Sequence, residues 1–120
     1  MERKMELVRK LLFKFEEIQE VDRGNISMFN IEGYAEEDII NHVFLLEQKR
    51  LVDIIDCSDK GGRAFLAQGL TWEGHDFLDK ARNDKIWKKA LNKFSNVGIT
   101  ATIDLLRDLL TSIIQEELKK

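Results

Sequence analysis

The sequence predicts a mainly helical chain with a small β-hairpin, and three observations carry this prediction. Apolar residues recur at steps of three and four over several long segments, a spacing that places them on one side of a helix. Two short β-rich runs flank a glycine-bearing polar turn, which is the pattern of a hairpin. Proline is absent from the 120 residues, which suits a chain built mainly of helices.

Composition and charge narrow the class of protein. Hydrophobic residues make up 43% of the chain and charged residues 34%, as expected of a globular domain with a hydrated surface. The 19 basic and 22 acidic residues give a net charge of -3, which excludes a uniformly basic nucleic-acid coat protein but not a local basic patch. The single cysteine excludes an intramolecular disulfide and a cysteine-rich zinc module, so we expect a cytoplasmic protein. Apolar runs are short and the first residues mix acids with bases, so we expect no membrane span and no signal peptide.

Residues 2–20 form the first predicted helix. Its apolar side chains are spaced by three and four residues, and its charged side chains fall largely on the other side. The stripe consists of Met5, Val8, Leu12, Phe15 and Ile18, widened by Leu11. The polar residues 22–25 predict a turn, and residues 26–31, which are partly β-branched or aromatic, predict a short strand.

Residues 36–49 form the second predicted helix. Apolar residues cover so much of its circumference that we expect it to be mostly buried. Its first turn is acidic, which suits the positive end of the helix dipole. The main stripe, Ile39, Val43 and Leu46, is expected to pack against Val8, Leu12 and Phe15 of the first helix.

A hairpin and a capped helix follow. Residues 51–57 and 64–67 predict two strands, and the glycine-bearing residues 58–63 predict the turn between them. Thr71 is a good N-cap for a helix over residues 72–81.

Residues 84–94 predict a further helix or a continuation of the previous one, and residues 101–118 predict the last helix. A buried helix followed directly by a hairpin is the core of a winged-helix domain. We therefore predict a winged-helix-like core over residues 1–80. Residues 81–120 form a C-terminal helical extension, which is either part of the same domain or a dimerisation element.

One string of the sequence is specific enough to suggest a family: Leu-Thr-Trp-Glu-Gly-His-Asp-Phe-Leu over residues 70–78. It is supported by residues 5–12 and by Gly33, Tyr34, His42, Leu45, Leu46, Leu51 and Trp87. With these residues the chain resembles a phage- and prophage-associated, winged-helix-like family, the domain of unknown function 2513. The resemblance implies a bacterial or phage origin and a cytoplasmic setting, and it brings no activity and no catalytic residues.

Two positions depart from the family pattern. Ala35 stands where the family favours a small hydroxyl cap, which costs the second helix about 1 kcal/mol. Arg50 stands where the family favours glycine, so it must either avoid the left-handed backbone conformation or bear a modest strain. Neither departure threatens the fold.

Few residues suggest catalysis or metal binding. His75 and Asp76 are adjacent, but the first turn of a helix explains both, with Asp76 complementing the dipole and His75 packing against the hairpin. Cys57 is expected to be a half-buried strand thiol. Together with His42, His75 and Asp76 it lacks the paired ligand spacing that is typical of a metal site. The chain has no phosphate loop and no nucleophile elbow. We expect no enzyme, no catalytic residue, no metal, no cofactor and no small-molecule substrate.

The two tryptophans could stack on nucleic-acid bases. For Trp72 a place in the core is favoured, because aromatic residues often lock the helix after the hairpin onto the core. Trp87 lies among lysines, and both interpretations stay open for it.

A basic segment predicts contacts with nucleic acid. Residues 80–93 contain six basic residues and one acidic residue, a net charge of +5. The helix that would read DNA in a winged-helix protein instead begins with three carboxylates, which phosphates would repel. The candidate nucleic-acid-binding residues are Lys85, Lys88, Lys89, Lys93 and Arg82, together with Lys60 and Arg63 of the hairpin turn.

The last helix is a candidate dimer interface, because its apolar seam is larger than a lone tail can leave in water. The seam residues are Ile103, Leu106, Leu109, Leu110 and Ile113. The alternative is that this helix folds back on its own chain.

Two functions fit the sequence. The first is a DNA-binding or transcription-linked accessory protein with duplex DNA as its partner, and it rests on the winged-helix pattern and the basic segment. The second is a protein-interaction module that acts on a host or phage protein, favoured by the acidic start of the second helix and the net charge of -3. Folds do not by themselves decide function.

Overall fold

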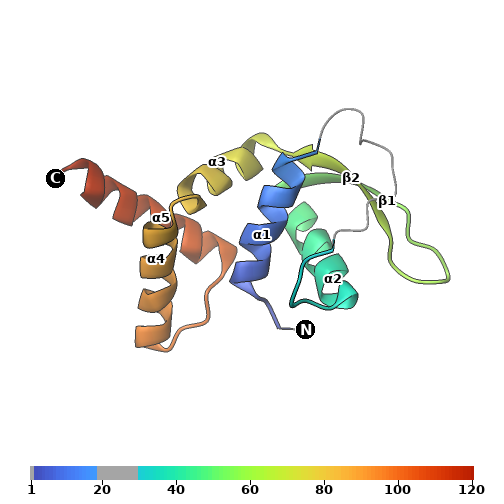
Figure 1. Cartoon of the computed structure of the whole chain (residues 1–120), viewed down its shortest axis with the longest axis horizontal. Coiled ribbons are helices and arrows are strands. Elements are labelled where there is room, and N and C mark those ends of the chain that lie inside the picture. Colours follow the sequence, from blue (N-terminus) through green and yellow to red (C-terminus); the bar gives the residue numbers. More distant parts are fainter. Residues whose placement is uncertain (1, 19–29) are drawn as a thin grey trace. The chain divides into compact units, whose positions relative to one another are not determined.

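The computed structural model describes residues 2–18 and 30–120, and within them the chain forms five helices and one two-stranded antiparallel hairpin (Figure 1). The predicted fold class, mainly α with a small β-hairpin and a C-terminal helix, is confirmed. The chain divides into two compact units, residues 1–75 and residues 76–120. In the first unit a buried helix leads directly into the hairpin, which is the winged-helix-like order of elements.

Some predictions are not tested by the described residues. The predicted turn over residues 22–25 lies outside them, and so do the first four positions of the strand predicted over residues 26–31. The last two positions, Asn30 and Ile31, are described and are not part of a strand. The proposed division into residues 1–80 and 81–120 stays a prediction.

The first unit is built on α1 (Met5–Glu16) and α2 (Glu36–Gln48), which pack against each other. α1 is shorter than the predicted range of residues 2–20, because Lys4 is its N-cap and Glu17 closes its last turn. The six residues predicted to form the contact between these helices are all buried: Val8, Leu12, Phe15, Ile39, Val43 and Leu46. The predicted core positions are therefore confirmed.

The hairpin consists of β1 (Val52–Asp56) and β2 (Phe65–Leu70). The strands pair antiparallel from Val52 opposite Leu70 to Asp56 opposite Phe65, with an irregularity between Asp53 and Ile54. α1 packs on β2 and α2 packs on β1, so one face of the hairpin closes the core of this unit. The other face carries exposed and half-buried side chains.

α3 (Trp72–Ala81) begins where the sequence predicted it, at a Thr71 cap. The backbone N–H of Gly74 donates to the Thr71 hydroxyl (2.9 Å), and the hydroxyl donates to the carbonyl oxygen of Arg50 (2.6 Å). A side chain at Gly74 would overlap the carbonyl oxygen of Leu51. This close approach explains the glycine and holds the first turn of α3 against the end of α2.

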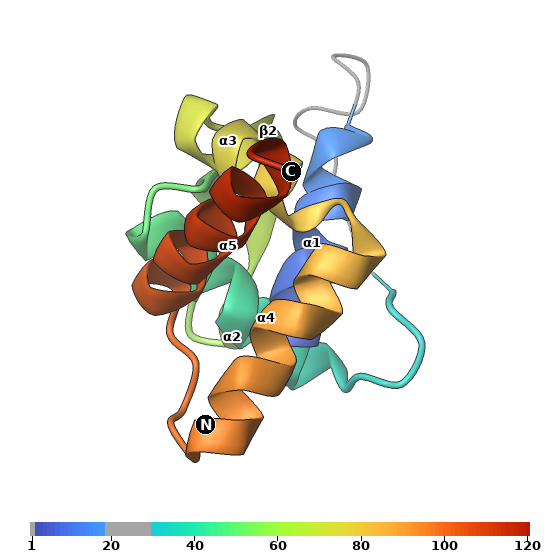
Figure 2. The same ribbon diagram turned by 90° about the vertical axis from the view of Figure 1, so that its left-hand side faces the viewer.

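The second unit pairs α4 (Asp84–Val97) with α5 (Ile103–Leu118), which lie side by side (Figure 2). Both helices begin with side-chain caps, since Asn83 accepts from the Ile86 N–H (3.0 Å) and Thr102 accepts from the Leu105 N–H (3.1 Å). Gly98 ends α4 in the left-handed conformation (φ 78°), for which glycine is suited. The buried residues of this pair are Trp87, Ala90, Leu106, Leu110 and Ile113.

Candidate functional site

The residues considered for catalysis or metal binding do not assemble into one site. His75 is exposed in the first turn of α3, and His42 is buried in α2. Cys57 was predicted to be half-buried, which is wrong: it is exposed because it lies just past the end of β1. In the part of the chain that the structure describes, no three His, Cys, Asp or Glu side chains are grouped closely enough to hold a metal ion.

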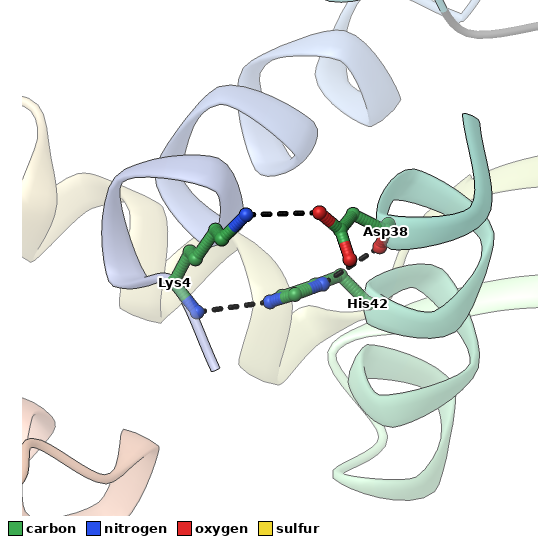
Figure 3. Close-up of polar contacts among 3 residues, drawn as sticks. All are labelled: Lys4, Asp38 and His42. Atoms are coloured by element: carbon green, nitrogen blue, oxygen red, sulfur yellow. Dashed lines mark hydrogen bonds and ion pairs between the residues drawn. The ribbon is translucent and has the colours of Figure 1, made fainter. Parts of the chain in front are cut away.

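Three polar residues meet where α1 begins (Figure 3). The backbone N–H of Lys4 donates to Nε2 of His42 (2.9 Å), and the Lys4 ammonium donates to Oδ2 of Asp38 (2.9 Å). Nδ1 of His42 lies 2.7 Å from the backbone carbonyl oxygen of Asp38. Since a backbone N–H can only donate, Nε2 carries no proton, and Nδ1–H must donate to that carbonyl.

This cluster joins helices and is not suited to acid–base chemistry. His42 is 1% exposed and both of its ring nitrogens are engaged, so it cannot reach a substrate. The hydrogen bond from Lys4 holds the pKa of Asp38 below its usual value of 3.8, and the same bond raises the pKa of Lys4 above 10.5. Both pKa shifts show that the contact favours the charged forms of Lys4 and Asp38. The arrangement supplies α1 with a partner for one of its first N–H groups, where no side-chain cap is present.

The two tryptophans have opposite environments. Trp87, on α4, is 1% exposed. Trp72 is 80% exposed, so the prediction that it lies in the core is wrong. The reason is its position on α3. The buried residues of this helix are Gly74, Phe77, Leu78 and Ala81, which lie on one side of it, and the helical repeat places residue 72 on another side.

The predicted basic residues fall into three groups. Lys85, Lys88, Lys89 and Lys93 are exposed on α4, and no ion pair or hydrogen bond ties them to other residues of the described ranges. Arg82 donates from Nε to Asp79 (2.9 Å). In the hairpin turn Lys60 is exposed, whereas the Arg63 guanidinium lies over the Phe44 ring at 4.7 Å from its centroid. Arg63 therefore helps to hold the hairpin on α2.

Charge is divided unequally between the units. Residues 1–75 contain fifteen acidic and ten basic residues, a net charge of -5, whereas residues 76–120 contain seven acidic and nine basic residues, a net charge of +2. The exposed positions of α2 include Glu36, Glu37 and Glu47. The helix that precedes the hairpin thus presents carboxylates to solvent, and the basic surface lies on α4.

The predicted dimer seam is largely covered within one chain. Leu106, Leu110 and Ile113 are buried, and Ile103 and Leu109 are half-buried. This burial is what the folding-back alternative expects of α5. Self-association stays a prediction, and the exposed apolar residues of α5 left for it are Leu105 and Leu118.

A groove of about 240 Å³ lies in the first unit, between the end of α1, the strands and the start of α3. Phe15 and Leu70 are among its apolar lining residues, and Glu16, Asp53 and His75 are its ionisable ones. The sequence offered no signal for it, because its walls come from three segments far apart in the chain.

A family of hypothetical proteins, DUF2513, matches residues 2–100. The chain belongs to the DUF2513 family. The match confirms the resemblance to the domain of unknown function 2513, and the phage or prophage association stays a prediction. An uncharacterized protein of Haemophilus influenzae is 30% identical over 118 residues, which cover 98% of this chain and 99% of the relative. No solved structure gives a significant match.

The DUF2513 match ends before α5, whereas the similarity to the Haemophilus protein extends over nearly the whole chain. α4, with its four exposed lysines, lies within the DUF2513 region. None of the helices described for this DUF2513 chain is long and apolar enough to cross a membrane.

Proposed function

We propose that this DUF2513 protein is a non-enzymatic, cytoplasmic accessory protein of bacterial or prophage origin that binds the phosphate backbone of duplex DNA. The observation that carries the proposal is the set of four exposed lysines on α4, Lys85, Lys88, Lys89 and Lys93, which have no ionic partner among the described residues. The winged-helix-like order of the first unit agrees with a DNA-linked role by analogy of fold.

The spacing of the lysines suits a phosphate backbone. Lys88 and Lys89 follow Lys85 by three and four residues, and Lys93 follows Lys89 by four residues, about one helical turn. Such side chains lie on neighbouring positions of one helical side and can reach successive phosphates. Contacts of this kind position a protein on DNA without reading its sequence.

The proposal differs from the usual DNA binding of winged-helix proteins, in which the helix before the hairpin, here α2, enters the DNA groove. A reading helix places its first residues near the groove, and α2 begins there with Glu36, Glu37 and Asp38. Carboxylates at those positions would be repelled by phosphates. DNA is therefore expected to lie against α4, with α2 away from the groove.

Fluorescence anisotropy with duplex DNA at several salt concentrations tests the proposal. Each phosphate contact contributes nearly one unit to the slope of log affinity against log salt. Replacing Lys88 and Lys89 by alanine should therefore reduce the slope by roughly two units. Lys119 and Lys120 at the C-terminus, both exposed, provide a matched loss of two charges that should leave the slope nearly unchanged.

Two results would contradict the proposal: no binding at ~50 mM salt, where even non-specific contacts are measurable, or the same slope in the Lys88 and Lys89 double variant. Replacing Glu36 and Glu37 by glutamine tests whether the start of α2 lies near the bound DNA. Stronger binding of that variant would place these carboxylates near the DNA backbone.

A protein-interaction module is the second candidate, and two observations favour it. The first unit has a net charge of -5, and Trp72 exposes 80% of its surface. Tryptophan is rarely left in water and is enriched among the residues that dominate protein interfaces.

A further inference from the structure

We infer that α4 enters the major groove of duplex DNA and that Asn92 and Asn96 contact base edges there, with adenine as the base that each prefers. The inference rests on the proposed function and adds sequence recognition to it, because phosphate contacts from the lysines would hold the protein on any duplex. It is carried by the positions of the two asparagines, which lie between lysines on the exposed side of α4.

Two amides are flanked by ammonium groups on the exposed side of α4. Asn92 and Asn96 are exposed and four residues apart, so they are neighbours on the helix surface. Lys88 precedes Asn92 by four residues and flanks the pair on one side. Lys93 precedes Asn96 by three residues and flanks the pair on the other side. Residues 85–97 contain no acidic residue that would repel phosphates.

The chemistry of these side chains matches the major groove. Within the part of the chain that the structure describes, the side chains of Asn92 and Asn96 have no hydrogen-bond partner, so both amides are available to a ligand. A side-chain amide offers donors and an acceptor, and it can pair with N6 and N7 of adenine at the same time. A lysine ammonium only donates, which suits phosphate oxygens. Amides with ammonium groups on both sides therefore correspond to base edges with a phosphate backbone on both sides.

The size and rigidity of α4 suit entry into the groove. An α-helix with its side chains is about 10–12 Å wide, and the major groove is about 12 Å wide. The opposite side of α4 carries the buried Trp87 and Ala90, and the helix packs against α5 (Figure 2). Asn83 caps the start of α4 and Gly98 closes its end. The exposed side is thus formed before binding, so little conformational freedom is lost when DNA binds.

The spacing of the asparagines predicts the spacing of the adenines. Asn92 and Asn96 are about 6 Å apart along the axis of α4, which is close to two base-pair steps of about 3.4 Å each. A helix that follows the groove therefore brings the two amides to bases about two steps apart.

Selection from a pool of duplexes with a randomised centre, carried out with the full chain, tests this recognition. The wild type should enrich adenine at two positions about two base pairs apart. The selected duplex is then compared by fluorescence anisotropy with two analogues, in which 7-deazaadenine or 3-deazaadenine replaces adenine at these positions. The first analogue lacks the N7 acceptor in the major groove, and the second lacks the N3 acceptor in the minor groove.

The 7-deazaadenine duplex should bind the wild type about fivefold or more weakly, because two hydrogen bonds to bases are lost. The 3-deazaadenine duplex should bind normally. Replacing Asn92 and Asn96 by alanine should remove the preference for the selected duplex and keep the salt slope. Alanine is the better helix former, so this variant retains α4. Gln115→Ala is the matched control, since it removes an exposed amide from α5 and should change neither property.

Equal enrichment of all four bases would overturn the inference, and so would an undiminished effect of 7-deazaadenine on the Asn92 and Asn96 double alanine variant. A larger effect of 3-deazaadenine would place α4 in the minor groove and overturn it as well. In each case the Lys88 and Lys89 double alanine variant should still reduce the salt slope, and DNA binding by the lysines would stand. An unchanged slope in that variant contradicts the proposed function instead, so the two failures are distinguishable.

Discussion

Arg50 has a backbone conformation that usually selects glycine. Its φ is 60°, the only positive value for a non-glycine residue in the described ranges. The conformation ends α2: the Arg50 N–H donates to the Glu47 carbonyl (2.9 Å) and the Leu51 N–H donates to the Leu46 carbonyl (3.0 Å). These two bonds satisfy carbonyl groups that the helix end leaves free, so the strain at Arg50 is tolerated.

Arg50→Gly should stabilise the protein. Glycine adopts a positive φ without a Cβ clash, and the relief is expected to be about 1 kcal/mol, reduced in part by the greater freedom of glycine in the unfolded chain. The free energy of unfolding in urea measures it. Lys49→Gly is the control, because Lys49 has a φ of -84° and no strain to relieve. A lower stability of Arg50→Gly would show that its side chain contributes more to the fold than the strain costs.

Gly74 is required for a different reason, since its backbone lies against another backbone segment. Gly74→Ala would place Cβ on the carbonyl oxygen of Leu51, and neither group can move without displacing α3 or β1. We expect a loss of about 3 kcal/mol or more in the free energy of unfolding. Glu73→Ala, at the exposed preceding position, should change stability by less than about 0.5 kcal/mol. An equal effect of both substitutions would show that the approach to Leu51 is not tight.

At the scale of elements, the contact between α1 and α2 combines an apolar stripe with one polar cluster. The apolar stripe supplies the burial, and Lys4, Asp38 and His42 join the start of α1 to the first two turns of α2. Tyr34, just before α2, adds a ring that faces the ammonium groups of Lys4 (5.8 Å) and Lys10 (5.4 Å). The polar contacts therefore fix how the ends of the two helices align.

The ion pair between Lys4 and Asp38 makes stability depend on pH. The hydrogen bond from Lys4 lowers the pKa of Asp38 below 3.8, so its contribution is present above that pH and is lost as the pH falls through the pKa of the folded state. The pKa of Lys4 is raised above 10.5, so its contribution is lost as the pH rises through that higher value. Asp38→Asn should lower the urea midpoint at about pH 7, and the difference from wild type should shrink as the pH falls below 3.8 through the pKa of the folded state.

Glu37→Gln is the matched control for this prediction, because it removes a carboxylate from the adjacent exposed position. A midpoint difference between wild type and Asp38→Asn that persists unchanged to the acid end would contradict the assignment of the effect to the ion pair.

At the scale of the whole molecule, the sequence combines an acidic unit and a basic unit in one chain of net charge -3. The overall charge conceals this division. It places the four lysines that we propose to contact DNA in the basic unit, on α4.

The packing of α5 leads to a test of self-association. Leu110 is completely buried within one chain, so Leu110→Ala should lower the free energy of unfolding by about 2–5 kcal/mol. If one chain alone buries this residue, the unfolding midpoint should not depend on protein concentration. If α5 also joins two copies, as the sequence predicts, the midpoint should rise with concentration, and light scattering should give twice the mass of one chain.

Much of the fold could be predicted from local sequence. The spacing of apolar residues located α1, α2 and α5, the Thr71 cap located α3, and the polar turn located the hairpin. For residues 84–94 the sequence left open a further helix or a continuation of the previous one, and the structure shows the separate helix α4. The Thr71 cap and the absence of a side-chain cap at Ala35 were also readable, since a cap depends on residues only two or three positions away. The strain at Arg50 was one of two alternatives that the sequence left open, because sequence shows which residue occupies a position but not which conformation it adopts.

The candidate sites depended on tertiary structure. Sequence reasoning placed Trp72 in the core, and only the fold shows that the buried stripe of α3 excludes it. The engagement of Arg63 with Phe44, the tautomer of His42 and the groove beside Phe15 each require residues from segments far apart in the chain. Apolar spacing, caps and turns act over a few residues and could be read from the sequence. The side of an element that meets solvent, and the partners a polar group finds, are decided by the packing of distant segments.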